Sequence, residues 1–263
     1  MTEKGQSPFH PGHPVPVEHF VGRANEVARI RRAARQVAAG KPQAVFISGE
    51  SGIGKSSLAQ FVRFTAEREQ GLLGYSLLEP GHTLEEIARP LLRSLYEQSC
   101  ESHRGLLLVL DEILGLATEE SFAFFIKDLF DSNALSDRPL PLLLLLCGTE
   151  ERRRKLIEHH PPVARIFEVT NIGPLSEMES REIFSRAFGR VQIEVTEDAM
   201  DILCWHSGGL PKLMHLLGEA AFRLAPGMEI NASVAVQATS AKKERPASRR
   251  GARRVRIPGS PDL

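Results

Sequence analysis

Apolar residues follow two different patterns along the first two thirds of the chain. Short runs of large or β-branched apolar residues predict buried strands, and segments with apolar residues every three or four positions predict amphipathic helices. Strands that alternate with helices are joined by crossovers, which gives a parallel sheet with helices on both faces. The pattern therefore predicts an α/β fold, with strands at 44–48, 72–78, 105–110, 142–147 and 167–170 and helices at 24–39, 55–69, 83–98, 119–129 and 150–158.

The pattern changes after Pro174, where only helical spacing remains, at 176–188, 196–206 and 210–224. This change predicts a second, small all-α domain. The two ends of the chain show no periodicity: the first is rich in Pro, His and Gly, and the last combines charge with Pro, Gly and Ser. We therefore expect an extended or mobile leader (1–17), an α/β core (18–174), a helical domain (175–228), and a linker with a disordered basic tail (229–263).

Composition narrows the class of protein. The 263 residues are 42% hydrophobic, which excludes a wholly disordered chain and is enough for a medium domain with a small companion. The longest apolar run, Leu140–Cys147, is too short to cross a bilayer, and we see no signal-peptide pattern at the N-terminus. The three cysteines are an odd number and unclustered, which argues against disulfides and a zinc site. We expect a soluble cytoplasmic protein without a membrane partner.

The formal net charge of zero conceals an asymmetry. Residues 241–263 hold eight basic and two acidic residues, a net charge of +6, so the remaining residues must carry −6. All eight basic residues lie in 242–256, and such a cluster attracts nucleic-acid phosphates. No aromatic residue lies in the tail to stack on bases, so binding of DNA or RNA by this segment would be non-specific. The alternative is a terminus that only improves solubility.

A glycine-rich segment between the strand at 44–48 and the helix from Lys55 fits G-x-x-x-x-G-K-[ST] without mismatch. In such a loop the glycines let successive N–H groups face phosphate oxygens, and the helix N-terminus adds its positive end. Lys55 can reach the β- and γ-phosphates, and the Ser56 hydroxyl can bind Mg²⁺. The predicted ATP-binding residues here are Gly49, Glu50, Ser51, Gly52, Ile53, Gly54, Lys55, Ser56 and Ser57.

Two acids follow the strand at 105–110, as hydrolysis of ATP requires. Asp111 can hold Mg²⁺ together with Ser56, and Glu112 can orient or deprotonate the attacking water. Lys55 and Glu112 are therefore the first catalytic candidates. The alternative is an acidic pair that caps a turn after a core strand.

Thr149 is a further catalytic candidate, because it follows the strand at 142–147 and would sense the γ-phosphate from there. The alternative is that its hydroxyl simply caps the helix from Glu150.

Six ordered segments resemble the AAA+ P-loop ATPases, in the branch that includes origin-recognition-type and STAND-like members. The segment from Gly49 to Ser56 resembles Walker A, the strand ending in Asp111–Glu112 resembles Walker B, and the strand before Thr149 resembles sensor 1. The other three are HFVGR at 19–23, PVARIF at 162–167 followed by GPLS at 173–176, and SGGLPK at 207–212.

The resemblance implies further roles. Val21 and Gly22 would pack near the adenine, Pro211 would begin the lid helix over the nucleotide, and Arg165 would act as an arginine finger towards a neighbouring subunit. The alternative for Arg165 is a surface arginine. Thr149 departs from the family, which often has Asn at this position. The chain has little sequence left for an appended winged helix or repeat array.

The residues support three functions. The first is an Mg²⁺-dependent ATPase that binds ATP and ADP and switches the conformation of a protein partner or of its own oligomer. The second is a nucleic-acid-associated loader or regulator whose tail contacts phosphates. The third, a small-molecule kinase, is less well supported, because no acceptor-site residues are evident after the P-loop helix.

Overall fold

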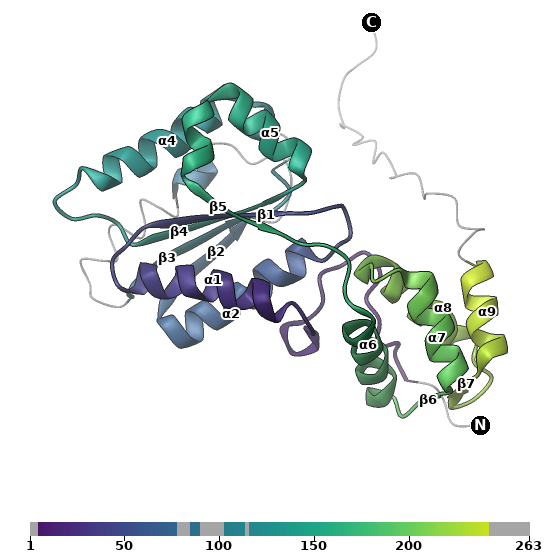
Figure 1. Ribbon diagram of the computed structural model, residues 1–263. Helices are drawn as coiled ribbons and strands as arrows, with labels where there is room; N and C mark the ends of the chain where they lie inside the picture. Colours follow the sequence, from purple (N-terminus) through teal and green to yellow (C-terminus); the bar gives the residue numbers. More distant parts are fainter. Residues whose placement is uncertain (1–4, 78–84, 90–102, 114–115, 242–263) are drawn as a thin grey trace, which may run out of the picture.

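The central feature is a five-stranded sheet with every strand parallel to its neighbours, in the order β2-β3-β4-β1-β5. The structure is a computed structural model that describes residues 5–77, 85–89, 103–113 and 116–241. This α/β topology confirms the predicted fold class (Figure 1). The strands are β1 (Gln43–Ser48), β2 (Leu72–Leu77), β3 (Gly105–Leu110), β4 (Leu142–Gly148) and β5 (Phe167–Asn171).

Helices cover both faces of the sheet (Figure 1). Successive strand residues point to opposite faces, so Val45 and Ile47 pack with α1 and α2, whereas Phe46 packs with α4 and α5. Because both faces are buried, the three central strands read as continuous apolar runs rather than as an alternation. The helices are α1 (Ala24–Ala38), α2 (Lys55–Gln70), α4 (Glu120–Ala134) and α5 (Glu150–His159), and residues 85–89 are also helical.

The strand register brings the segments after three strands to one edge of the sheet. Cys147 of β4 lies opposite Ile47 of β1, and Leu146 lies opposite Leu110 of β3. The loop after β1 and the acids after β3 therefore follow strands that end at the same level, on either side of β4.

The last third of the described chain packs around its own apolar cluster. A parallel strand pair ties its two halves together, with Glu194 opposite Glu229 and Val195 opposite Ile230. A capping box at Ser176 and Glu179 begins the first helix. The elements are α6 (Glu177–Arg190), β6 (Glu194–Val195), α7 (Glu197–Ser207), α8 (Pro211–Leu224), β7 (Glu229–Ile230) and α9 (Ala232–Ala241).

The expectation of an extended or mobile leader over residues 1–17 is wrong in one respect: its described part has no helix or strand up to Pro16, but it packs against the helical cluster. Phe9 is 4% exposed and packs in the helical cluster, its ring centroid 4.9 Å from that of Phe188 and 6.2 Å from that of Phe184. A single apolar residue among prolines has no periodicity, and its partners lie far away in the sequence. The pattern therefore gave no sign of this contact.

The expected linker from residue 229 is also wrong as far as residue 241. β7 and α9 continue the helical cluster, in which Val234, Ala235 and Ala238 are buried. Small alanine side chains in this segment produce weak contrast between its apolar and polar faces, so the apolar pattern did not predict the helix. The part of the predicted helix at 83–98 that includes Pro90, and the basic tail at 242–256, lie outside the described residues.

A smaller difference concerns the end of one helix. α4 runs to Ala134, beyond the predicted end at residue 129, because residues 131–134 are polar or small and mostly exposed, so they extend the helix without adding to its apolar periodicity. None of the helices in the described ranges has the length and apolar character required to span a membrane.

Candidate nucleotide-binding site

The loop between β1 and α2 depends on its glycines. Gly52 and Gly54 have φ angles of +80° and +100°, a left-handed region that strongly favours glycine. At Gly49 the constraint is close approach, because a Cβ there would lie 2.8 Å from the Ile172 side chain. Gly54 is the N-cap of α2, so the loop ends directly at the N-terminus of a helix. Such an end binds anions through unpaired N–H groups and the helix dipole.

Lys55 is the first residue of α2 and folds back over the loop. Its Nζ donates to the carbonyl oxygen of Gly49 at 3.0 Å and to that of Glu50 at 2.8 Å. Burial lowers the pKa of Lys55, and the nearby Cys147, Asp111 and Glu112 oppose this shift. The ammonium is therefore a partly desolvated cation whose charge is favoured by the two acids after β3.

The two acids after β3 have different environments. Asp111 is 5% exposed, whereas Glu112 is exposed and has a φ angle of +48°, which turns the chain sharply after the strand. The backbone N–H of Glu112 donates to Asp111 Oδ1 at 3.0 Å. Next to them, burial raises the pKa of the Cys147 thiol well above its usual value, and Asp111 adds to the shift. The thiol is therefore neutral beside Asp111.

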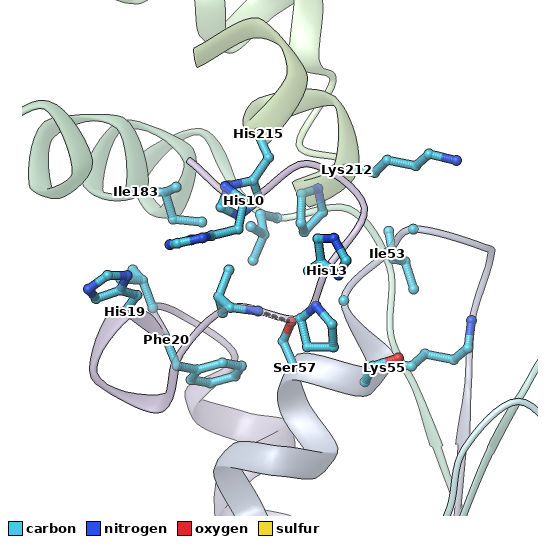
Figure 2. Close-up of a pocket in the computed structure, with 18 of the residues that line it drawn as sticks. His10, His13, His19, Phe20, Ile53, Lys55, Ser57, Ile183, Lys212 and His215 are labelled. Atoms are coloured by element: carbon cyan, nitrogen blue, oxygen red, sulfur yellow. Dashed lines mark hydrogen bonds between the residues drawn. The ribbon is translucent and has the colours of Figure 1, made fainter. Parts of the chain in front are cut away.

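Lys55 and Glu112 border one pocket of about 410 Å³, whereas Asp111 and Cys147 do not line it (Figure 2). Ser51–Ser57 and Glu112 line it from the core, α6 and the start of α8 line it from the helical cluster, and the segment at 8–15 passes along it. In this view Lys55 lies at the lower right, His10, His19 and His215 lie towards the left and top, and His13 lies between them (Figure 2). The pocket therefore has a cationic loop at one end and a mixed apolar and imidazole wall at the other.

A family model described as an AAA ATPase domain matches residues 19–157, more than half of the chain. The chain belongs to the AAA ATPase family. The matched range contains the loop, Lys55, Asp111 and Glu112. No curated protein matches the chain.

Solved structures share the fold of this AAA ATPase. The Thermotoga maritima RuvB Holliday junction branch migration motor superposes with a TM-score of 0.63 at 20% identity, over 87% of this chain and 72% of that chain. The ADP form of the Aeropyrum pernix ORC2 protein gives 0.66 at 18% identity, over 89% and 71%. At such identities the likeness concerns the fold alone.

The helical cluster of the AAA ATPase contacts the loop directly through α8. The backbone N–H of Lys212 donates to the carbonyl oxygen of Gly52 at 3.1 Å. Pro211, the first residue of α8, lines the pocket, and a Cβ at Gly52 would lie 2.7 Å from the Lys212 side chain. Movement of α8 must therefore disturb the loop.

A second link runs through Arg23, which is 7% exposed. One guanidinium nitrogen donates to the carbonyl oxygen of Ile53 at 3.1 Å, and the Arg23 backbone N–H donates to Glu179 of α6 at 2.8 Å. Gly22 leaves the space for this contact, because a Cβ there would lie 2.6 Å from the Glu179 carboxylate. Val21 lines the pocket beside them, whereas Gly22 supports α6 instead.

The segment at 8–15, which we call the strap, connects the helical cluster to the core. The backbone N–H of His10 donates to His215 Nδ1 of α8 at 3.2 Å, and that of Val15 donates to Ser57 Oγ of α2 at 3.2 Å. The His10 and His19 rings stack with centroids 5.7 Å apart. The strap therefore crosses the pocket between its two walls (Figure 2).

His215 gives a testable pH dependence. Burial, followed by the nearby His10 and His19, lowers its pKa to about 4. The unfolded chain, with a pKa near 6.5, binds a proton that the folded state rejects, so stability falls as the pH drops from about 6.5 towards 4, by up to about 3 kcal/mol. Urea unfolding at pH 7.5 and pH 5 should show a smaller pH effect for His215→Asn, which retains an acceptor but does not titrate.

His206→Asn is the matched control, because His206 is exposed on α7. It should lose stability with acid as the wild type does. An equal pH effect in the wild type and His215→Asn would contradict the role given to His215.

Two predicted catalytic residues lie outside the pocket lining. Thr149 is the N-cap of α5, where its Oγ1 accepts from the Arg152 backbone N–H at 3.4 Å. Arg165 ends a short 3-10 helix, η3 (Pro161–Arg165), and is exposed, and its side chain forms no hydrogen bond or ion pair with a described residue. The structure thus shows the helix-capping alternative for Thr149, and their catalytic roles stay predictions.

Sequence reasoning missed most of the wall opposite the loop. It gave no individual role to His19 or Arg23, although both lie in the HFVGR segment, and it did not identify the strap histidines or the α6 side chains that line the pocket. The strap carried no periodic signal. His215 interrupts the apolar face of the 210–224 helix, and this interruption is the one local sign of a polar contact there.

Proposed function

We propose that this AAA ATPase binds ATP with Mg²⁺ in the pocket between its α/β core and the helical cluster, and hydrolyses it to ADP and phosphate. We call the helical cluster, from α6 to α9, the lid. The observation that carries the proposal is the convergence of Lys55, the N-terminus of α2 and Glu112 on one pocket. A cationic loop with exposed N–H groups suits a polyphosphate, and an exposed carboxylate on the same pocket suits a water nucleophile.

In this proposal each side chain has a distinct task. The backbone of Gly49–Gly54 cradles the phosphates, and the Lys55 ammonium exchanges its two loop carbonyls for β- and γ-phosphate oxygens. Glu112 accepts a proton from the attacking water, or orients it in line with the γ-phosphate. Phosphoryl transfer requires mainly positioning and charge neutralisation, and these groups provide both.

The metal prediction fits the donor types at the site. Ser56 offers a hydroxyl and Asp111 a carboxylate, and Mg²⁺ takes hard oxygen ligands, with one or two from the protein and the rest from phosphates and water. Among the described residues there is no group of three His, Cys, Asp or Glu arranged to hold a metal ion, so Asp111 would act with few protein partners. When bound, Mg²⁺ would neutralise charge on the β- and γ-phosphates.

We propose that the lid transmits the state of the nucleotide. The contacts from Lys212 to Gly52 and from Glu179 through Arg23 to Ile53 couple α8 and α6 to the loop. A change in the loop on hydrolysis would tilt the lid, and a protein partner or a second copy would sense that tilt. The exposed Arg165 has the accessibility needed to reach a neighbouring subunit.

The direct test is phosphate release from ATP by the purified full chain with Mg²⁺, and again with excess EDTA. We expect turnover that requires Mg²⁺, together with saturable binding of ADP. A wild-type chain that binds neither ATP nor ADP with Mg²⁺ present would refute the proposal.

A further inference from the structure

The helical lid exposes its largest aromatic side chain on α7, a helix that does not line the nucleotide pocket. Trp205 of α7 is 83% exposed, and Met178 at the start of α6 is 78% exposed. Beside Trp205 lies a hollow of about 710 Å³, bordered by Leu175, Cys204 and the Gly208–Gly209 turn. Large exposed apolar side chains next to a hollow are typical of interaction surfaces.

Carboxylates predominate around this hollow. Arg181 forms ion pairs with Glu177 and Glu197, each at 3.2 Å, and with Asp201. Three carboxylates thus share one guanidinium, and their side chains are 75%, 90% and 59% exposed respectively. The surface therefore combines an aromatic ring with excess negative charge, which suits a cationic peptide, because Arg and Lys bind both carboxylates and aromatic faces.

The fold brings the start of the basic tail to this end of the lid. β6 and β7 are parallel and paired in register, and each is followed by one residue, Thr196 or Asn231, and then by a helix. α7 and α9 therefore run side by side in the same direction from a common level (Figure 1). Counted from those two residues, Trp205 in α7 corresponds to Ser240 in α9, so the described chain ends at the level of Trp205.

We propose that the Trp205 surface, made by Trp205, Met178, Arg181 and its three carboxylate partners, docks the chain's own basic segment at 242–256. This segment follows α9 immediately and carries eight basic residues and one acid. Its 15 residues can span up to about 50 Å, far more than the width of one helix. Guanidinium groups of the tail stack on Trp205 and pair with carboxylates that Arg181 does not saturate.

This docking has a consequence for partners. Phosphates of a nucleic acid would have to compete with the Trp205 surface for the same arginines. A docked tail is therefore not available to bind nucleic acid. The proposal does not depend on ATP binding or hydrolysis, since no residue of the Trp205 surface lines the nucleotide pocket.

The test uses Trp205, the single tryptophan of the chain, as its own probe. The wild type is compared with a full-length variant in which Arg249, Arg250, Arg253 and Arg254 are replaced by glutamine. In low salt the wild type should show a blue-shifted emission and quenching by acrylamide about twofold weaker than the variant, because docking excludes water from the ring. Salt near 1 M should remove the difference, since it screens charges beyond about 3 Å.

A double variant, Glu177→Gln with Asp201→Asn, should behave like the arginine variant with the tail intact. Glu182→Gln is the matched control, because Glu182 pairs with Arg186 elsewhere on α6. A synthetic peptide of residues 242–263 should restore protection to the arginine variant in a saturable manner. Identical emission and quenching in the wild type and the arginine variant would overturn the proposal. Protection of Trp205 from acrylamide that is lost on dilution and unaffected by the arginine substitutions would also overturn the proposal. Such a result would assign the surface to contact with a second copy.

Discussion

Replacing Lys55 with alanine is expected to weaken binding of Mg·ATP and to lower turnover by at least about a hundredfold, as removal of a donor to developing charge generally does. The ammonium is partly buried and, among the described residues, donates only to the loop carbonyls of Gly49 and Glu50. These neutral contacts are easily exchanged for charged phosphate oxygens, which bind an ammonium more strongly. Titration calorimetry with ATP and ADP, and phosphate release, would measure the two losses.

The control for this variant is Lys41→Ala, because Lys41 is an exposed lysine between α1 and β1. It should bind and turn over ATP like the wild type. Unchanged ATP affinity and turnover in Lys55→Ala would remove the loop from the proposed site. A general loss of folding is separated from a loss of function by comparing urea midpoints of the three proteins.

Glu112→Gln is expected to separate binding from chemistry. Glutamine retains the size of the side chain but cannot accept the proton of the attacking water, so turnover should fall by about 10²- to 10⁴-fold. ATP affinity should remain within a few-fold of the wild type, because Glu112 is exposed at the pocket and a carboxylate repels phosphates rather than binding them. Single-turnover hydrolysis combined with equilibrium binding would measure both quantities.

Glu120→Gln, an exposed acid at the first position of α4, is the matched control. It should retain wild-type turnover. Equal rates for wild type and Glu112→Gln would show that another group activates the water, with Asp111 as the next candidate.

Local patterns made the core predictable. The strands around the loop are buried on both faces, so their apolar runs are unbroken and their ends are marked by glycine or acid. The phosphate-loop spacing is likewise contained in eight consecutive residues, so no distant contact is needed to recognise it. The α/β class, the strand positions and the grouping of Lys55 with the acids could therefore be expected from the sequence.

Contacts between distant segments could not be predicted in this way. Phe9, His10 and His19 acquire their surroundings from α6 and α8, and nothing near them in the sequence encodes this. α9 is stabilised by burial against α7 and α8 rather than by a strong apolar face. The contact between Lys212 and Gly52 depends on the placement of the lid, which the turns at its borders do not reveal.

The strap also sets an order of events during synthesis. Phe9 leaves the ribosome long before Phe184, Phe188 and Gly218, which build its cavity. Chains generally fold domain by domain from the N-terminus, so the sheet can form while Phe9 still has no partner. Closure of this contact over about two hundred residues is then a late step, and it leaves a nascent AAA ATPase without its strap until the whole lid has been translated.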